Sequence, residues 1–230
     1  MGGLAQSTGT PPGSGFMTAD GALHAGVMIV AEALGAEEAD QMKALVGPSG
    51  FLMGRAFSRK GWGRDDFRYA NTIFCRPTDN KIRDKRGHLY PWAETAITHC
   101  ASNLDKEIDS AQPRCIVTLG QTAFERLTGS TLPLMAARGY VWREKNDRCW
   151  VVPTFHPAFL LRGQQALTQV LLWDVQKARK VAAEDNYTYE NPNCLMNPSL
   201  EVWEAYVADF LRVPSRVLAF DVETPWRRKH

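Results

Sequence analysis

Four short apolar runs, separated by longer stretches with helical spacing, restrict this chain to few folds. The runs are VMIVA (27–31), FRYANTIF (67–74), CIVTLG (115–120) and CWVVPTF (149–155). Apolar runs of this length are typical of strands buried on both faces, as in a parallel sheet. Parallel strands need long crossover connections, and the intervening stretches are long enough to supply them. The pattern therefore predicts an α/β domain built on a parallel sheet.

Helical stretches separate or follow these runs. The clearest covers residues 92–111, where apolar side chains recur at spacings of three and four, the period of one helix face. Residues 121–129 form a shorter stretch, and Gly129 stands where a helix C-cap is expected. The other predicted helices are residues 47–61 and 166–185. Strands that alternate with helices predict a parallel sheet covered on both faces.

Three polar residues fall at the predicted carboxyl ends of the strands. Glu32 follows the first run, Asn71 lies near the end of the second, and His156 follows the fourth. Ligands bind outside the carboxyl ends of strands in such sheets, so these side chains are expected to share one edge. Each also has a structural interpretation. Asn71 could bond nearby backbone, His156 could be a satisfied structural histidine, and Glu32 could favour a helix N-terminus, a role that Glu37 and Glu38 fit better.

Length and composition restrict the setting in which the chain works. Its 230 residues are enough for one sizeable domain, or for one domain and part of a second. A net charge of +2 is too small to indicate nucleic-acid binding by itself. No apolar run approaches the roughly 18 residues of a membrane span. The N-terminus, MGGLAQSTGTPPGSG, lacks the basic start and apolar core of a signal peptide. These features predict a cytoplasmic protein, bacterial or in a phage-infected host, in which disulfides are not expected.

Five segments follow one another in a characteristic order. They are VMIVAEALGAEEAD (27–40), LVGPSGFLM (45–53), YANTIFCRPTDN (69–80), CIVTLGQTAFERLTG (115–129) and VVPTFHPAFLLRG (151–163). In this order and spacing they resemble the family 4 uracil-DNA glycosylases and their phage-borne relatives. The resemblance implies a three-layer αβα sandwich around a four-stranded parallel sheet. It also implies an activity, hydrolysis of the bond that joins uracil to deoxyribose in DNA.

The resemblance implies a catalytic role for each polar residue at the predicted edge. Asn71 would pair with the polar edge of uracil, because its amide offers one acceptor and two donors. His156 would donate to the negative charge that develops on uracil O2, and Glu32 would stabilise the sugar cation or orient water. A base inside a duplex must first be flipped out, unless it is already single-stranded.

The same resemblance implies further substrate-binding residues near the base, namely Gly35, Leu45 and Asn80. Three positions depart from the family pattern. Ala31 replaces the usual Gly before the catalytic acid, Leu34 replaces the usual Pro, and Leu45 replaces the aromatic residue that stacks on the base. Substrate scope is therefore less constrained by the sequence than the fold is.

The segment after His156 is expected to contact DNA. Family members insert an apolar side chain here to fill the gap left by the flipped base, and Phe159 and Leu160 are the candidates. Arg162 follows them as a further substrate-binding residue. The structural alternative is that the two leucines simply begin a helix.

Cys75 and Cys100 match two of the four ligands of the family's 4Fe–4S cluster. The resemblance implies that an N-terminal Cys-x-x-Cys pair completes the set, but no Cys precedes Cys75. The expectation is that the chain is truncated or has lost the full set, since two thiolates hold a cluster poorly. The remaining cysteines lie in predicted buried strands or beyond the domain: Cys115, Cys149 and Cys194. The candidate substitute ligands are three histidines, His24, His88 and His99.

An insertion, KIRDKRGHLYPW (81–92), is longer than in typical members of the family. Its basic residues could contact DNA phosphate, or they could belong to a solvated loop. Its KRGH segment is weakly similar to the Lys-Arg-Arg-Ile-His of a glycosylase that traps itself covalently on DNA, which would make His88 the attached residue.

The end of the chain carries a different motif. VLAFDVETP (217–225) resembles the first motif of DnaQ-like 3′–5′ exonucleases, with Asp221 and Glu223 on one face of a predicted strand, as a two-metal site requires. The chain stops before the remaining acidic ligands, so no active nuclease is expected. The predicted division is an irregular arm (1–24), a glycosylase-like domain (25–185), a linker (186–198) and the truncated start of an exonuclease-like domain (199–230).

The principal hypothesis is a DNA glycosylase that removes uracil in base excision repair, working as a monomer within a longer, phage-type polypeptide that continues into a nuclease or polymerase. One alternative is a non-catalytic DNA-binding module of such a polypeptide, which the three departures favour. Another is a glycosylase for a different deaminated base, such as hypoxanthine. The retained Glu32, Asn71 and His156 favour catalysis.

Overall fold

Four parallel strands form the centre of the fold, as the apolar runs predict. They are β3 (Val27–Ala33), β4 (Phe67–Ile73), β6 (Cys115–Leu119) and β8 (Trp150–Thr154). Their order in the sheet is β4-β3-β6-β8, and the register pairs Val27 with both Phe67 and Cys115. The computed structural model describes residues 14–185, 187–188 and 199–212.

The sheet has six strands rather than the predicted four. Two short antiparallel strands, β2 (Asp20–Gly21) and β7 (Trp142–Arg143), pair with β4 and β8 at the two edges. Separately, β1 (Ser14–Phe16) pairs with β5 (Cys75–Arg76). The described part of the predicted irregular arm therefore contains two strands. Strands of two or three residues are too short to show a hydrophobic period, so the sequence pattern could not reveal them.

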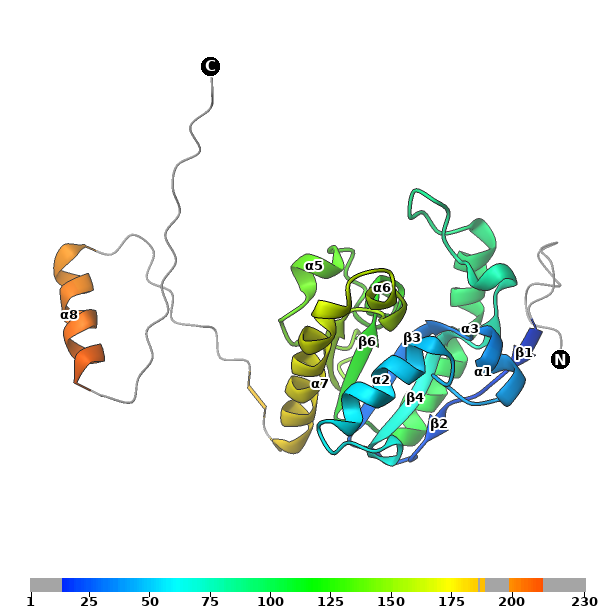
Figure 1. The fold of residues 1–230 in the computed structure, drawn as a ribbon, viewed down its shortest axis with the longest axis horizontal. Coiled ribbons are helices and arrows are strands. Elements are labelled where there is room, and N and C mark those ends of the chain that lie inside the picture. Colours follow the sequence, from blue (N-terminus) through cyan, green and yellow to red (C-terminus); the bar gives the residue numbers. More distant parts are fainter. Residues whose placement is uncertain (1–13, 186, 189–198, 213–230) are drawn as a thin grey trace, which may run out of the picture. The chain divides into compact units, whose positions relative to one another are not determined.

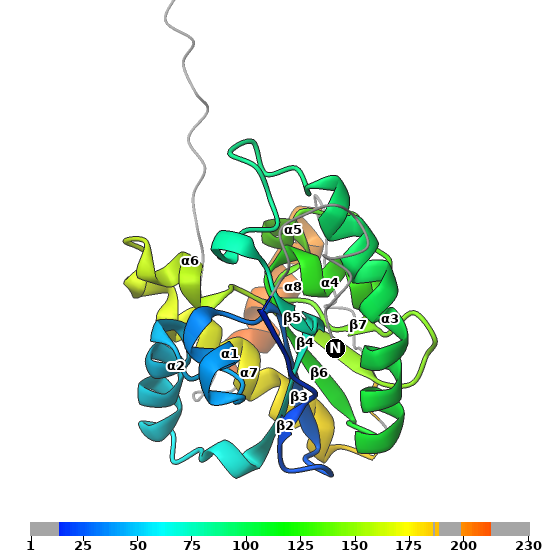
Figure 2. The ribbon, with the colours of Figure 1, turned by 90° about the vertical axis from the view of Figure 1, so that its right-hand side faces the viewer.

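Helices cover both faces of the sheet, giving the expected three layers (Figures 1 and 2). On one face, α2 (Pro48–Ser58) and α7 (Thr168–Ala183) pack in one core cluster, and on the other α3 (Pro91–Ala111) and α4 (Gln121–Thr128) pack in a second. β3 contributes Val27 and Ile29 to the first cluster and Met28 and Val30 to the second. Alternate side chains of a strand point to opposite faces, so burial on both explains the continuous apolar run.

Short elements complete this unit. The helices are α1 (Ala36–Gln41), α5 (Leu134–Ala137) and α6 (Pro157–Leu161), and the 3₁₀ turns are η2 (Arg64–Asp66), η3 (Thr78–Asn80) and η4 (Gln165–Leu167). Gly129 ends α4 in the left-handed conformation, with φ of 72°, as its sequence position predicts. No helix of the described segments is long and apolar enough to cross a membrane.

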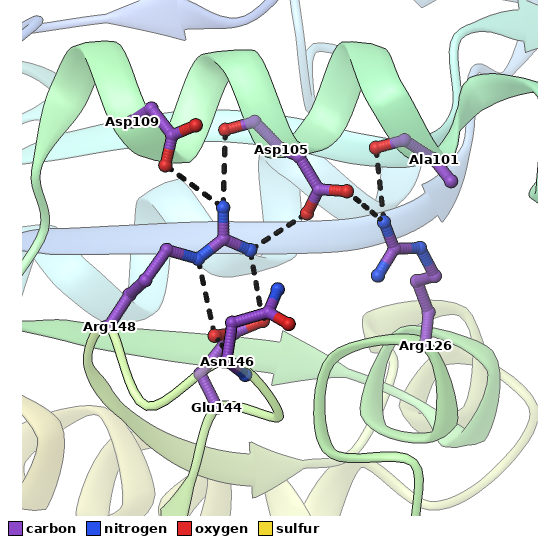
Figure 3. Close-up of polar contacts among 7 residues, drawn as sticks. All are labelled: Ala101, Asp105, Asp109, Arg126, Glu144, Asn146 and Arg148. Carbon is purple, nitrogen blue, oxygen red and sulfur yellow. Dashed lines mark hydrogen bonds and ion pairs between the residues drawn. The ribbon is translucent and has the colours of Figure 1, made fainter.

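An ionic network joins α3 and α4 to the connection between β7 and β8 (Figure 3). Arg148 donates to Asp105 at 2.7 Å, to Glu144 at 2.9 Å and to Asp109 at 3.0 Å. Arg126 donates to the other oxygen of Asp105 at 2.9 Å. Residues 144–149 precede β8, so the network lies beside the amino end of that strand, away from the predicted site.

Residues 1–188 form one compact unit and residues 189–230 a second. In the second, residues 200–211 form helix α8 (Leu200–Leu211), which begins with Ser199 accepting a hydrogen bond from the Val202 N–H. Asp221, Glu223, Cys194 and most of the predicted linker lie outside the described residues.

Candidate active site

A cleft of about 430 Å³ opens at the carboxyl ends of the central strands. It is lined by every predicted catalytic and substrate-binding residue except Phe159 and Leu160. A volume of this size lies within the usual range for small-molecule clefts and can hold a nucleobase. The sheet thus brings together side chains that are far apart in the sequence.

Asn71 presents an unused amide to this cleft. It lies on β4, paired with Ala31 of β3, and only 5% of it is exposed. Within the described part of the chain its side-chain amide has no hydrogen-bond partner, so it does not bond nearby backbone. An amide that faces a cleft and has donors and an acceptor free is suited to pair with a ligand.

Glu32 lies near the end of β3, where it is half-buried in the cleft wall. Thr122 Oγ1 on α4 donates to Glu32 Oε2 at 2.9 Å. Burial raises the pKa of Glu32, while the Thr122 hydrogen bond and the charges of Arg83 and Arg162 oppose this rise. A carboxylate with a raised pKa at a cleft is suited to act as a base or to stabilise a cation.

Glu38 has a structural role near a helix N-terminus, which the sequence left open for Glu32, Glu37 or Glu38. It lies in the first turn of α1, is 8% exposed, and accepts hydrogen bonds from the N–H groups of Val46 at 3.1 Å and Gly47 at 2.8 Å. These bonds hold the connection between α1 and α2. Gly35, the N-cap of α1, leaves room for this arrangement, because a Cβ there would lie 2.3 Å from Glu38 Oε2.

His156 is the N-cap of α6, and its ring has a defined tautomer. Its Nδ1 accepts the N–H of Ala158 at 3.1 Å, which leaves the ring proton on Nε2 in the neutral form. Burial lowers the pKa of His156 to about 4, with a further contribution from the charge of Arg162. His156 is therefore a neutral Nε2–H donor near pH 7. It is also half-buried and caps a helix, so it does not stand in a purely solvent-facing loop.

Gly120 permits the close approach of β6 to His156. Its φ is +88°, a value that L side chains rarely adopt, and an added Cβ would lie 3.3 Å from the Cβ of His156. The glycine at the end of the third apolar run therefore has a backbone role beside the site.

The segment after His156 departs from its prediction at one residue. Leu160 is fully buried in the core and is not available as an inserted side chain in this conformation. Phe159 is 37% exposed and stacks on Phe155, with 5.4 Å between ring centroids. Leu161, 39% exposed, lines the cleft together with Arg162. Successive residues of a helix differ by about 100° in direction, so Leu161 faces the cleft while Leu160 faces the core.

Leu45 and Asn80 line the cleft from strained backbone positions. Leu45 has φ of +49°, and Asn80 has φ of +53°. Gly50 of α2 allows the Leu45 backbone to approach closely, because a Cβ on Gly50 would lie 1.7 Å from the Leu45 carbonyl oxygen. Asn80 Oδ1 accepts from Arg76 Nε at 2.8 Å. The cleft wall has no aromatic side chain among the described residues, in keeping with leucine at position 45.

The cysteines of the described segments do not form a metal site. Cys75 and Cys100 are close enough that Cys100, after burial, contributes to the raised pKa of Cys75. However, no group of three or more His, Cys, Asp or Glu side chains in the described part could hold a metal ion. A 4Fe–4S cluster needs four ligands, so the donors present do not fit it. Burial raises the pKa of Cys149 to about 12 and also raises that of Cys115, as expected for inert thiols.

Comparisons with known proteins identify related sequences. The family model described as uracil DNA glycosylase superfamily matches residues 18–180. A type-4 uracil-DNA glycosylase of Sulfurisphaera tokodaii is 31% identical over 182 residues, which cover 76% of each chain. The type-4 uracil-DNA glycosylase of Thermotoga maritima is 30% identical over 167 residues, which cover 70% of this chain and 79% of the relative.

Proposed function

The chain belongs to the uracil-DNA glycosylase superfamily, and on that premise we propose that it hydrolyses the N-glycosidic bond between uracil and deoxyribose in DNA, the first step of base excision repair. One observation supports this most directly. One cleft of nucleobase size is lined by the carboxylate of Glu32, the neutral imidazole of His156 and the amide of Asn71, which has no hydrogen-bond partner in the described segments.

Binding begins with a uracil nucleotide that is single-stranded or flipped from the duplex. The amide of Asn71 pairs with the imide edge of the base, satisfying a group that has no hydrogen-bond partner among the described residues. Arg162, exposed at the end of α6, contacts a DNA phosphate. Phe159 and Leu161 are the exposed apolar candidates to fill the space left by the base.

Chemistry then breaks the C1′–N1 bond, with the electron pair passing to uracil. His156 Nε2–H donates to O2 as negative charge accumulates there, and because His156 is neutral it lowers the energy of the anion without first transferring a proton. Glu32 stabilises the positive charge on the sugar and orients the water that adds to C1′, and the proton that this water loses balances the proton that the uracil anion takes up. The products are free uracil and an abasic deoxyribose.

The proposal is tested with single-stranded and duplex oligonucleotides that contain one uracil. Excision leaves an abasic site that alkali cleaves, so the expected result is a shortened labelled strand. Micromolar protein that binds the oligonucleotide but leaves no alkali-labile site overnight would instead support a non-catalytic DNA-binding module. The departure at Leu45, together with the lack of Phe, Tyr or Trp among the described residues that line the cleft, is the observation that favours this second function.

The same departure makes base specificity a separate question. A panel of oligonucleotides with uracil, hypoxanthine or xanthine at one position distinguishes a uracil enzyme from a glycosylase for another deaminated base. We propose uracil as the preferred base, because Asn71 offers both the acceptor and the donors that its imide edge requires.

The tail carries a further proposal. Asp221 and Glu223 in VLAFDVETP support an exonuclease-like domain beginning after the linker, as in a phage-type repair polypeptide, with the glycosylase-like domain at residues 25–185. Metal-dependent nuclease activity of a polypeptide that carries this motif, lost in Asp221→Ala, is the test.

A further inference from the structure

The basic insertion is anchored to the helix that contacts Glu32. A bridge between Arg83 and Leu89 closes the loop, and Asp84 Oδ1 accepts from the N–H groups of Arg86 at 2.8 Å and His88 at 2.9 Å. Arg83 points back from this loop. Its Nη1 donates to the Gly87 carbonyl at 2.9 Å, so the guanidinium has a defined position.

Arg83 Nη2 donates to Thr122 Oγ1 at 3.0 Å and lies 3.4 Å from Glu125 Oε2. Thr122 is 2% exposed, and its hydroxyl is 2.9 Å from Glu32 Oε2. The direction of this chain follows from chemistry. A guanidinium can only donate, so Thr122 accepts from Arg83 and its single hydroxyl proton is left for Glu32. A carboxylate accepts a hydrogen bond more strongly when it is ionised, so the Thr122 hydroxyl favours the ionised form of Glu32.

We propose that Arg83 and Thr122 are positioning residues that hold Glu32 ionised and correctly oriented for uracil excision. This inference rests on the proposed function. It assigns the insertion a role in the reaction that its charge alone does not suggest, because one residue of the loop reaches the reacting carboxylate through a buried hydroxyl.

The charges around Glu32 are consistent with this role. Burial raises the pKa of Glu32, and the Thr122 hydrogen bond, Arg83 and Arg162 each act to lower it. Glu37 and Glu38 line the same cleft, and His156 is neutral there. Loss of the Thr122 hydroxyl removes one of the opposing influences, so the pKa of Glu32 should rise further and less carboxylate should be ionised at a given pH.

The first experiment measures single-turnover excision from uracil-containing single-stranded DNA between pH 5 and pH 9. Thr122→Val, which keeps the shape but loses the hydroxyl, should lower the rate about tenfold at neutral pH and move the acidic limb upward by about one pH unit. Arg83→Gln should move it the same way by less. Thr122→Ser should restore the wild-type profile.

Arg86→Gln is the matched control, because it removes one positive charge from the same loop without touching Thr122. It should leave the limb where it is. A Thr122→Val profile identical to wild type in rate and midpoint overturns the proposal. So does an equal shift in Arg86→Gln, since that would show loop charge rather than the hydroxyl contact to be responsible. If Thr122→Val does not fold, Arg83→Gln decides, and an unchanged limb overturns the proposal.

A second experiment needs no activity. Protein labelled with ¹³C at the glutamate carboxyl carbon is titrated without DNA, and the Glu32 signal is assigned by its loss in Glu32→Gln. A higher titration midpoint of Glu32 in Thr122→Val supports the positioning role of Thr122 even if the protein excises no uracil. In that case only the proposed function fails. An unchanged titration midpoint of Glu32 overturns the positioning role of Thr122, whatever the excision activity.

Discussion

Thr122 and Arg126 stand one turn apart on α4, yet they belong to two polar regions with opposite properties. Arg126 enters the ionic network of Figure 3, where Glu144 is 1% exposed and accepts from both Arg148 Nε and Nη2. Thr122, itself buried, donates to Glu32 of the cleft wall, where Asn71 is nearly as buried as Glu144 but its amide has no hydrogen-bond partner within the described residues. Glu144 and Asn71 are buried to a similar extent, but only Glu144 has hydrogen-bond partners within the described residues.

The difference separates groups that stabilise the fold from groups kept for a ligand. In the network every carboxylate is met by a guanidinium, although Arg126 leaves its Nε and Nη1 without acceptors. Buried polar groups stabilise only when paired, so this region should contribute to folding. The cleft wall instead carries the Asn71 amide, which has no hydrogen-bond partner among the described residues, and the Glu32 carboxylate, whose pKa is raised by burial, as is usual at a functional site. Substitutions in the two regions should therefore have opposite effects.

Glu32→Gln should give the largest loss of activity in the cleft. Removing the carboxylate is expected to lower the single-turnover excision rate by roughly 10²–10⁴. Folding raises the pKa of Glu32, because burial disfavours the ionised carboxylate. The free energy of unfolding therefore falls as the pH rises from the unfolded pKa of Glu32 through its higher folded pKa. The neutral variant should thus melt at a higher temperature near pH 7. A Glu32→Gln variant that melts at a lower temperature and excises uracil at the normal rate would show that Glu32 is not catalytic.

His156→Ala should lower the excision rate by roughly a hundredfold to a thousandfold, because the developing anion loses its donor. Its effect on stability should be modest, about 1 kcal/mol, from the lost cap of α6. Single-turnover kinetics and a thermal melt on one preparation separate the effects. His156→Asn is the matched variant, since Asn can still cap the helix. If the Asn variant keeps full activity, a structural role for His156 is sufficient.

Glu144→Ala tests the other region. The substitution removes acceptors from Arg148 and from the Asn146 N–H, and the expected loss of unfolding free energy is about 1–3 kcal/mol. The excision rate at a temperature where the variant is folded should stay within about twofold of wild type, because the network lies away from the cleft and distant sites act independently. Chemical denaturation and single-turnover assays check both parts. A large loss of rate in the folded variant would show that the two regions are coupled through α4.

The smallest expected effect is the contribution of His156 to the pH profile. With a folded pKa of about 4, below its usual value, His156 stays neutral from pH 5 to pH 8 and should produce no limb there. The stability that depends on its neutral form is present above about pH 6.5 and is lost as pH falls towards 4. Excision profiles of wild type and His156→Asn should therefore have the same shape above pH 5. A limb near pH 6.5 that disappears in His156→Asn would contradict the lowered pKa.

Much of the fold could be predicted from local patterns. Strands β3, β4, β6 and β8 were expected within two residues of their observed ends, because burial on both faces leaves continuous apolar runs. The same patterns placed Glu32, Asn71 and His156 at one edge, since parallel strands end together. The two-residue strands β2 and β7 left no such trace.

What the sequence determined by itself is the layered architecture and the edge at which polar groups gather, because periodic burial is recorded residue by residue along each strand and helix. The tertiary structure alone decided which side chains touch there. The contact of Thr122 with Glu32, the anchoring of Arg83, and the choice of Leu161 over Leu160 depend on helix rotation and on packing between segments distant in the chain. The His156 tautomer likewise depends on a backbone turn that brings the Ala158 N–H to Nδ1. Such contacts have no local period, so they become visible only when the packed chain fixes distances and directions.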